Sequence, residues 1–322
     1  MQNIAETKPV ASHRQRLERV DIARGVALIA MAIYHFAWDL EFFGFLAPGT
    51  TSHGGWKLFA RGIASSFLFL VGFSLVLAHG HGIRWKAMGK RLLQICTAAA
   101  AISLLTWFIS PESFIFFGIL HQIALASVLG LLFLRLPAFL TLIIAALVIC
   151  APLYARAEVF NHIWLAWVGL STVPIRSNDY VPLFPWFGAV LISIATAQLA
   201  EKFNWLPLLV SKKQTKFPQR PLIYIGRHSL AFYLIHQPVL LALLFAVSQL
   251  WPPQTPRQLF THSCVSACLP DGSEALCQNF CSCVVSKLDK AQLFDDVFSG
   301  KSDANTDDEV QGIVNFCSPT AE

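Results

Sequence analysis

His35 and Asp39 lie four residues apart in an otherwise apolar stretch near the N-terminus. Residues at that spacing project from the same face of a helix. A carboxylate placed there can orient an imidazole and stabilise its charged form, which a general base requires. The alternative is a Trp38-Asp39 pair that marks the interfacial end of the helix, and the spacing alone is a weak signal.

His53 stands in the sequence Thr51-Ser52-His53-Gly54-Gly55-Trp56, one short loop after the His35 helix. The glycines allow a backbone to approach a ligand closely. Trp56 is a residue type that anchors segments at a membrane interface. An isolated loop histidine is more often a bystander, but this position favours His53 as a second member of a site with His35.

A third group of polar residues interrupts an apolar stretch late in the chain. Ser229, Tyr233 and His236 follow an i, i+4, i+7 pattern, so they share one helix face. They would serve either as functional groups or as hydrogen-bonding contacts between packed helices. His121 and His228 are further histidines in or beside apolar segments, where ionisable groups are costly and suggest function. The chain has no Gly-x-Ser-x-Gly motif, so a covalent serine mechanism has no support.

These residues require a membrane-embedded scaffold. Of the 322 residues, 55% are hydrophobic and 13% are charged, and the mean hydropathy is +0.55. Soluble domains carry about twice that share of charge, so an ordinary cytosolic globule, a fibrous repeat and a disordered chain are excluded. The apolar runs predict an all-α bundle of about seven membrane spans. They are Gly25–Phe45, Leu58–Ala78, Leu92–Ile109, Phe114–Leu134, Ala138–Ala155, Pro182–Ala200 and Leu222–Leu250.

Loop charge predicts the orientation. With the N-terminus in the cytoplasm, the inner segments hold 15 Lys and Arg residues, whereas the outer segments hold only Lys57, Arg61, Arg156 and Arg176. This is the bias of the positive-inside rule. We also expect the segment 160–174, with its tryptophans, to lie at the outer interface. The expected organisation is a polar N-terminus (1–20), a transmembrane domain (21–250), a Pro-rich linker (251–256) and a helical tail (257–322).

The tail differs in composition from the rest. It holds six of the eight cysteines, and residues 251–322 carry 10 acidic against 4 basic side chains. Seven spans place it outside, where disulfides persist. Two Cys-x-x-x-Cys pairs flank the turn signal Pro270-Asp271-Gly272, which predicts a helical hairpin with nested bridges. The expected pairs are Cys268–Cys277, Cys264–Cys281 and Cys283–Cys317, one of 15 connectivities, and a zinc site is the alternative. Cys96 and Cys150 lie in apolar runs and are expected to be buried.

Several ordered motifs together resemble one family. The stretch Arg19–Leu28, the His35 helix end and the block Gly226–His236 resemble the heparan-alpha-glucosaminide N-acetyltransferase catalytic-domain family of multi-pass acyltransferases, over roughly residues 17–250. The resemblance implies transfer of an acetyl group from cytosolic acetyl-CoA to an amino sugar across the membrane. It makes His53, followed by Trp56, the counterpart of the family's catalytic histidine, and His236 the match of a late-helix histidine. His35, His228 and His121 stand where the lysosomal enzyme has Asn, Asn and Gln.

The chemistry of acyl transfer assigns further roles. A neutral histidine suits the base, and hydroxyls could stabilise the developing oxyanion. The substrate or oxyanion candidates are Tyr34, Trp56, His121, Ser229 and Tyr233. The polyanionic CoA needs basic partners at the inner side, and arginine binds phosphate best. The candidates are Arg24, Arg84, Lys86, Arg91 and Arg227, although the positive-inside bias explains most such charges by itself.

Two other functions stay open from the sequence. A proton-coupled transporter or flippase would also use intramembrane His and Asp residues. A membrane scaffold would dock partners through the tail. For the acyltransferase we expect acetyl-CoA as co-substrate, no metal, a glycan or small-molecule acceptor, the lipid bilayer as environment, and no nucleic acid, with a homodimer left open. The expected location is the bacterial inner membrane with the tail in the periplasm.

Overall fold

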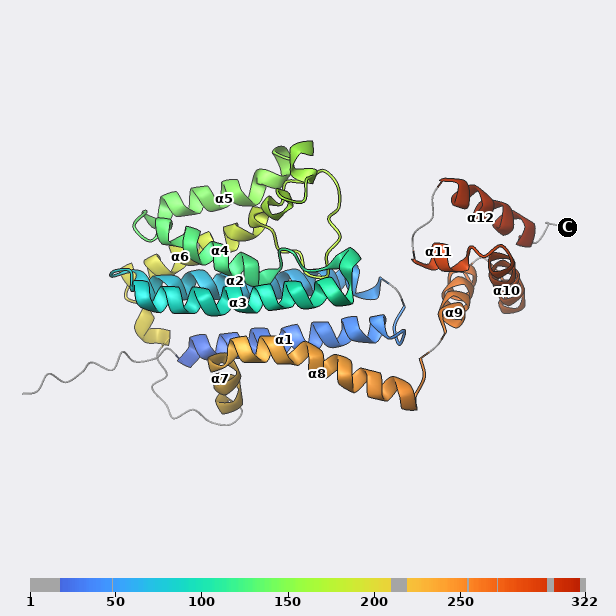
Figure 1. The fold of residues 1–322 in the computed structure, drawn as a ribbon, viewed down its shortest axis with the longest axis horizontal. Coiled ribbons are helices and arrows are strands. Elements are labelled where there is room, and N and C mark those ends of the chain that lie inside the picture. Colours follow the sequence, from blue (N-terminus) through green and yellow to red (C-terminus); the bar gives the residue numbers. More distant parts are fainter. Residues whose placement is uncertain are drawn as a thin grey trace, which may run out of the picture. The chain divides into compact units, whose positions relative to one another are not determined.

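A computed structural model describes residues 18–47, 49–209, 219–253, 255–270, 272–299 and 304–318. Every regular element in these ranges is a helix, as the sequence predicts (Figure 1). The chain forms two compact units. The first contains the residues up to 33 and residues 58–236, and the second contains residues 34–57 and those from 237 onward.

In the described part of the chain, eight α-helices precede the tail. They are α1 (Glu18–Phe42), α2 (Gly54–His79), α3 (Trp85–Ile109), α4 (Ile119–Gly130), α5 (Ala138–Tyr154), α6 (Leu183–Lys202), α7 (Gln219–Arg227) and α8 (Ser229–Leu250). Single 3₁₀ turns stand between them: η1 (Thr50–Ser52), η2 (Pro111–Ser113), η3 (Leu131–Phe133), η4 (Glu158–Asn161), η5 (Ala166–Val168) and η6 (Leu206–Leu209).

Five of the described helices are long and apolar enough to cross a membrane, namely α1, α2, α3, α6 and α8. The predicted spans Phe114–Leu134 and Ala138–Ala155 contain shorter apolar helices, Ile119–Phe133 and Ala138–Tyr154. The predicted single helix Leu222–Leu250 is wrong in one respect, because it is divided at His228 into α7 and α8. A hydropathy pattern reports composition and cannot detect such a break.

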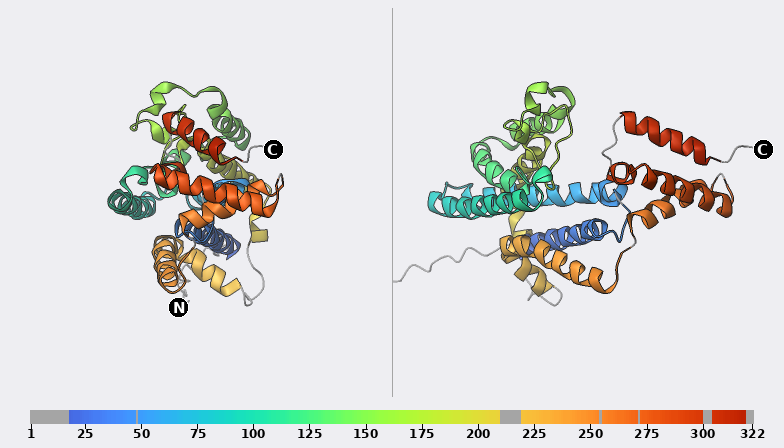
Figure 2. Two further views of the ribbon diagram at one scale, coloured as in Figure 1. Left: turned by 90° about the vertical axis from the view of Figure 1, so that its right-hand side faces the viewer. Right: turned by 45° about the vertical axis from the view of Figure 1, so that its right-hand side comes forward.

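The core of the first unit lies between α2, α5 and α6. Leu68 and Ile194 are fully buried, and the Ser193 hydroxyl donates a hydrogen bond to the Phe69 carbonyl. Gly72 has no side chain to separate its helix from the Val190 carbonyl of α6. Helix α5 packs along α6 (Figures 1 and 2). Small residues at such contacts let helices approach where no aqueous hydrophobic effect drives them together.

The outer surface of the helices is strongly apolar. Leu93, Phe108 and Leu153 are among many exposed large hydrophobic side chains, which suits contact with lipid. Cys96 and Cys150 are exposed on this surface, so the expectation that they are buried is wrong. Both cysteines lie on helices whose outward faces are as apolar as their inward ones, and composition alone does not distinguish the two.

The tail contains α9 (Pro256–Cys268), α10 (Glu274–Lys290), α11 (Phe294–Ser299) and α12 (Ala304–Cys317). Its disulfides join Cys264 to Cys281, Cys268 to Cys277 and Cys283 to Cys317, the same three pairs that the spacing predicts. Helix α10 packs against both α9 and α12.

A small apolar core supports these bridges. Val284, Leu288 and Phe294 are buried in it. Arg257 holds Asp289 with its Nε at 2.8 Å from the carboxylate. Phe316 lies outside this core: it is 70% exposed, with the Lys287 ammonium 4.0 Å from its ring centroid.

Candidate functional site

His53 occupies the position between η1 and α2, and its side chain is exposed. Its Nδ1 lies 2.8 Å from the Gly49 carbonyl oxygen. A carbonyl can only accept, so Nδ1 carries the proton and donates it, and Nε2 of the neutral ring is left with its lone pair. An exposed Nε2 lone pair is the form that a general base needs.

Three predicted residues, Tyr34, His35 and Trp56, lie close together in the second unit. The Tyr34 ring centroid lies 5.9 Å from that of His35 and 6.3 Å from that of Trp56. The Tyr34 hydroxyl is 3.5 Å from the carbonyl oxygen of Thr51, two residues before His53. The structure therefore places Tyr34 against the segment that carries His53, with the rings of His35 and Trp56 beside Tyr34.

The carboxylate of Asp39 is fully buried, and its Oδ1 accepts a 2.6 Å hydrogen bond from the Gln237 amide. Gln237 was not expected from the sequence, since 198 residues separate the two positions. The sequence also gave no role to Glu41, whose carboxylate contacts the segment before His53. In the sequence, the only indication of a role for Glu41 is that it is a charged residue among apolar ones.

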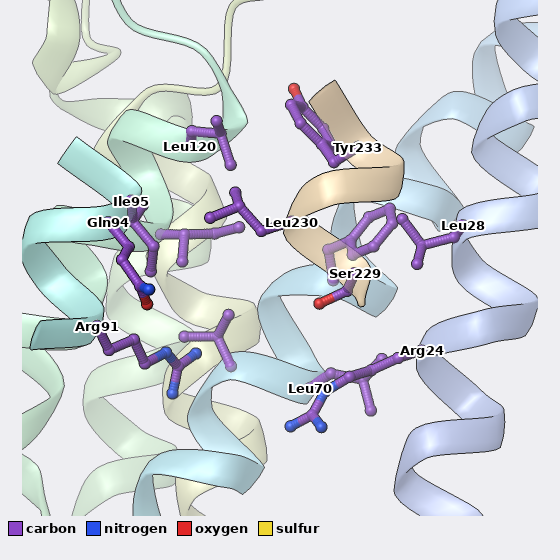
Figure 3. Close-up of a pocket in the computed structure, with 13 residues that line it drawn as sticks. Arg24, Leu28, Leu70, Arg91, Gln94, Ile95, Leu120, Ser229, Leu230 and Tyr233 are labelled. Carbon is purple, nitrogen blue, oxygen red and sulfur yellow. The ribbon is translucent and has the colours of Figure 1, made fainter. Parts of the chain in front are cut away.

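A cavity of about 230 Å³ lies in the first unit between α1, α2, α3, α4 and α8. Its polar lining consists of Arg24, Arg91, Gln94, Ser229 and Tyr233, and the remaining lining is apolar. Figure 3 shows the guanidinium groups of Arg24 and Arg91 at one end and the Tyr233 ring at the other. Two of the five predicted cation candidates and two members of the predicted polar stripe thus share one cavity.

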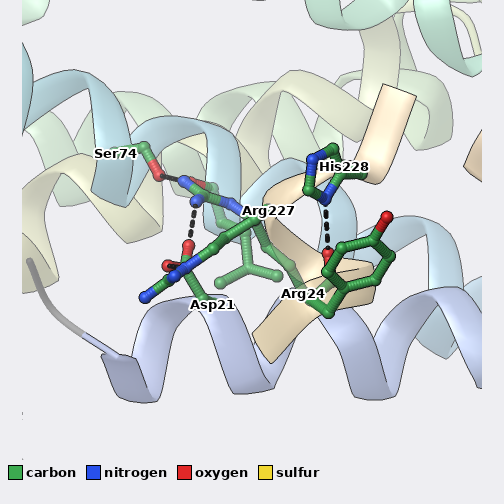
Figure 4. Close-up of polar contacts among 7 residues, drawn as sticks. Asp21, Arg24, Ser74, Arg227 and His228 are labelled. Carbon is green, nitrogen blue, oxygen red and sulfur yellow. Dashed lines mark hydrogen bonds and ion pairs between the residues drawn. The ribbon is translucent and has the colours of Figure 1, made fainter. Parts of the chain in front are cut away.

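Arg24 is held in place by neighbours on two helices (Figure 4). Its Nη1 lies 3.0 Å from the Asp21 carboxylate, and its Nη2 donates a 2.5 Å hydrogen bond to the Ser74 hydroxyl. Arg227 of α7 approaches the same Asp21 carboxylate at 3.5 Å. Asp21 is 2% exposed, so it is a buried anion between two arginines. The i, i+3 spacing of Asp21 and Arg24 could have revealed it.

Arg91 differs from Arg24 in its surroundings. Within the described ranges, no carboxylate lies within ion-pair distance of the Arg91 guanidinium. Arg91 and Arg24 are close enough to repel each other electrostatically. A guanidinium beside a second one, facing a cavity, is suited to an anionic ligand.

The structure separates the other predicted cations from this cavity. Arg84 Nε donates to the Ala78 carbonyl at the end of α2. Lys86 is exposed, and Arg227 contacts Asp21 without lining the cavity. The three positions follow the positive-inside bias in sequence but do not converge in space.

His121, His228 and His236 have local partners. His121 Nδ1 accepts from the Gly118 amide, so its Nε2–H donates to Ser103 Oγ at 3.2 Å. His228 Nδ1 contacts the Tyr224 carbonyl at 3.0 Å (Figure 4), and His236 Nδ1 contacts the Tyr233 carbonyl at 2.7 Å. Both ring nitrogens of His121 are thus engaged at the start of α4, which favours a structural role for it.

Asp179, in the loop before α6, is a titratable residue that the sequence did not single out. Its carboxylate accepts the Ile119 amide hydrogen at 2.8 Å, at the N-terminus of α4. Burial raises the pKa of Asp179 to about 6, although that hydrogen bond opposes the shift. A Cβ at Gly118 would displace this carboxylate from its present position.

The long apolar helices and the apolar outer surface define a polytopic membrane protein. A family model described as heparan-alpha-glucosaminide N-acetyltransferase, catalytic, matches residues 16–238, and the chain belongs to this family. The match ends within α8, so the tail lies outside it. No match was found among curated proteins or among solved structures.

Proposed function

We propose that this protein moves an acetyl group from cytosolic acetyl-CoA to an amine or hydroxyl of a glycan on the periplasmic side of a bacterial inner membrane. His53 acts as the general base. The single observation that carries the proposal is the hydrogen bond from His53 Nδ1–H to the Gly49 carbonyl, which leaves Nε2 exposed as a proton acceptor. Membership of the acetyltransferase family supports the reaction class.

The reaction requires one acyl transfer and the movement of one proton, through His53, from the acceptor to the CoA sulfur. His53 Nε2 takes the proton from the acceptor amine or hydroxyl as that atom attacks the thioester carbonyl. The carbon–sulfur bond then breaks, and the CoA thiolate receives the proton. Tyr34, in the same unit as His53, is the hydroxyl group proposed to stabilise the oxyanion. His35 assists the proton transfer in this scheme, and Asp39 of the same unit acts with it through its buried carboxylate.

The cavity of the first unit fits part of a CoA molecule. Its two guanidiniums suit a phosphate, and its apolar walls suit the hydrocarbon portions of the pantetheine arm. Ligand pockets commonly have volumes of about 300–1,000 Å³. At about 230 Å³ the cavity holds one portion of the donor and not the whole of it.

Two features support the proposed orientation. Basic residues concentrate in the segments assigned to the cytoplasm. Three disulfides in the tail suit an oxidising compartment such as the periplasm. These features come from different parts of the chain and agree on one topology.

The test uses the purified full-length protein in lipid nanodiscs with radiolabelled acetyl-CoA and an envelope glycan extract. We expect labelled glycan from the wild type, and a loss of about 10²–10⁴-fold in rate for His53→Ala. The matched control is His262→Ala, an exposed histidine outside the family match. Wild-type turnover in His53→Ala would refute the base. Substrate counterflow without thioester cleavage would instead support a transporter.

A further inference from the structure

The Glu41 carboxylate accepts three hydrogen bonds from the segment before His53. Its Oε1 accepts from the Gly49 amide at 2.5 Å. Its Oε2 accepts from the Thr51 amide at 2.8 Å and from the Thr51 hydroxyl at 2.7 Å. Both carboxylate oxygens of one side chain, on the last turn of α1, therefore hold the turn that leads into α2.

Gly49 connects this carboxylate to the imidazole. Its amide hydrogen goes to Glu41, and its carbonyl oxygen accepts the Nδ1–H of His53 at 2.8 Å. The Gly49 φ of +82° is the left-handed conformation that glycine adopts without strain. The Gly49 carbonyl selects the His53 tautomer, and the same residue is held by the Glu41 carboxylate through its amide.

Thr51 makes the arrangement rigid. It is 1% exposed, and Glu41 Oε2 receives both its amide and its hydroxyl hydrogen. Charge-assisted hydrogen bonds of this kind are about twice as strong as neutral ones. Asp39, the other carboxylate near the end of α1, has the Gln237 amide as its partner, so the two acids have separate tasks.

We propose that Glu41 is the positioning residue of His53: it fixes the Nδ1–H tautomer through Gly49 and thereby keeps Nε2 available as the proton acceptor. Glu41 does not touch the reacting atoms. The expected effect of Glu41 on the rate rests on the proposed function of His53 as the base. The expected effect of Glu41 on the His53 tautomer does not. Exposed neutral histidines normally favour the Nε2–H form, so the structure requires a local cause for the opposite form.

The direct test is nitrogen NMR of the full-length protein in nanodiscs, with ¹⁵N-labelled histidine, at a pH well above the usual histidine pKa of about 6.5. The His53 signals are assigned by their absence in His53→Ala. We expect the wild type to show a protonated Nδ1 and an unprotonated Nε2 at His53. Glu41→Gln should shift His53 toward the Nε2–H form, because the amide NH2 replaces one acceptor oxygen and faces a backbone N–H donor, that of Gly49 or that of Thr51.

Two further variants separate positioning from folding. Glu41→Asp keeps the charge but shortens the side chain by one methylene, so it cannot reach both amides, and it should shift the tautomer in the same direction. Glu112→Gln removes an exposed carboxylate in η2 and should leave the His53 signals unchanged. A wild-type tautomer in both Glu41 variants would overturn the proposal.

The kinetic readout follows the same logic. Glu41→Gln should lower kcat by about 5- to 50-fold, less than the about 10²–10⁴-fold loss expected on removal of the base itself. The KM for acetyl-CoA should stay within about twofold, since Glu41 does not line the donor cavity. If the wild type transfers no acyl group, the proposed function fails while the tautomer result still decides the role of Glu41. A raised KM with unchanged kcat would contradict positioning of the base.

Discussion

The Gln237 amide donates a 2.6 Å hydrogen bond to the Asp39 carboxylate and so links α8 to α1 within the second unit. Asp39 is fully buried, and within the described residues its second oxygen has no hydrogen-bond partner. A buried carboxylate with a single donor depends strongly on that donor.

Gln237→Leu should therefore destabilise the protein by about 1.5–3 kcal/mol, the range for a hydrogen bond to a charged group. Asp39→Asn should cost less, because the asparagine oxygen still accepts from Gln237. The measurement is the thermal midpoint in detergent, with Gln249→Leu, an exposed glutamine of the same helix, as control. Equal midpoints for Gln237→Leu and Gln249→Leu would show that the buried hydrogen bond does not contribute.

Gly226→Ala should disrupt the packing of α7 on α1. An added Cβ would lie 1.9 Å from the Asp21 carbonyl oxygen, which is backbone and cannot rotate away. We expect a loss of about 1–3 kcal/mol or more. Gly89→Ala is the control, because a Cβ there meets no atom within 4 Å and alanine should stabilise that helix by about 0.5–1 kcal/mol. Similar thermal midpoints in the two variants would contradict the contact.

Asp179 should make stability depend on pH. Its folded-state pKa of about 6 lies above the unfolded value of about 3.9, so the folded protein binds more protons between these values. The free energy of unfolding then falls as the pH rises from about 4 to about 6, by up to about 3 kcal/mol, and the fall is complete above that window.

Asp179→Asn should remove this fall in the free energy of unfolding. The stability of the variant relative to the wild type should therefore increase as the pH rises from 4 to 7. The difference between the two proteins isolates Asp179 from nearby titratable groups such as His121 and Tyr233. Thermal midpoints at several pH values measure it, and Glu158→Gln, an exposed acid, should show no such trend. A difference that does not change with pH would refute the raised pKa.

Arg91→Gln should weaken acetyl-CoA binding. A charge-assisted hydrogen bond to phosphate is worth about 1.5–3 kcal/mol, so the Kd should rise about 10- to 150-fold. Lys90→Gln removes the same charge from the neighbouring, exposed position and should change the Kd little. Calorimetry with CoA on the full-length protein makes the comparison. An equal effect of both substitutions would mean that only the general positive charge matters.

The tail should contain no free thiol among its six cysteines. Peptide mapping without reduction is expected to recover three linked pairs, those of Cys264, Cys268 and Cys283 with their partners. Replacing both Cys283 and Cys317 with Ser should expose α12 to protease, since that bridge joins it to α10. Stoichiometric zinc with reduced cysteines would contradict the disulfides and the oxidising compartment.

Local patterns account for what the sequence could predict. The apolar runs give the membrane helices because length and composition suffice for that inference. The cysteine pairs follow from two i, i+4 spacings around one turn, which is again local information. The shared cavity of Ser229 and Tyr233 follows from their spacing on one helix face.

The missed features depend on contacts that no local pattern contains. Gln237 meets Asp39 only because α1 and α8 pack together. Arg91, on α3, lines the cavity, whereas Arg84 precedes that helix and donates to the Ala78 carbonyl. Glu41 receives its role from the path of a short turn, which composition does not specify. The break at His228 lies two residues after Gly226, where α7 packs closely against the Asp21 carbonyl of α1, a contact that hydropathy does not report.

The contact between α1 and α7 uses two glycines, each next to an arginine. A Cβ on Gly25 would meet the Leu222 carbonyl, and one on Gly226 would meet the Asp21 carbonyl. Because the opposing atoms belong to the main chain, no second-site substitution can make room for a larger residue at either position. In evolution, replacement of these two glycines should therefore occur only together with loss of α7. The side chains around them can instead change in compensating pairs.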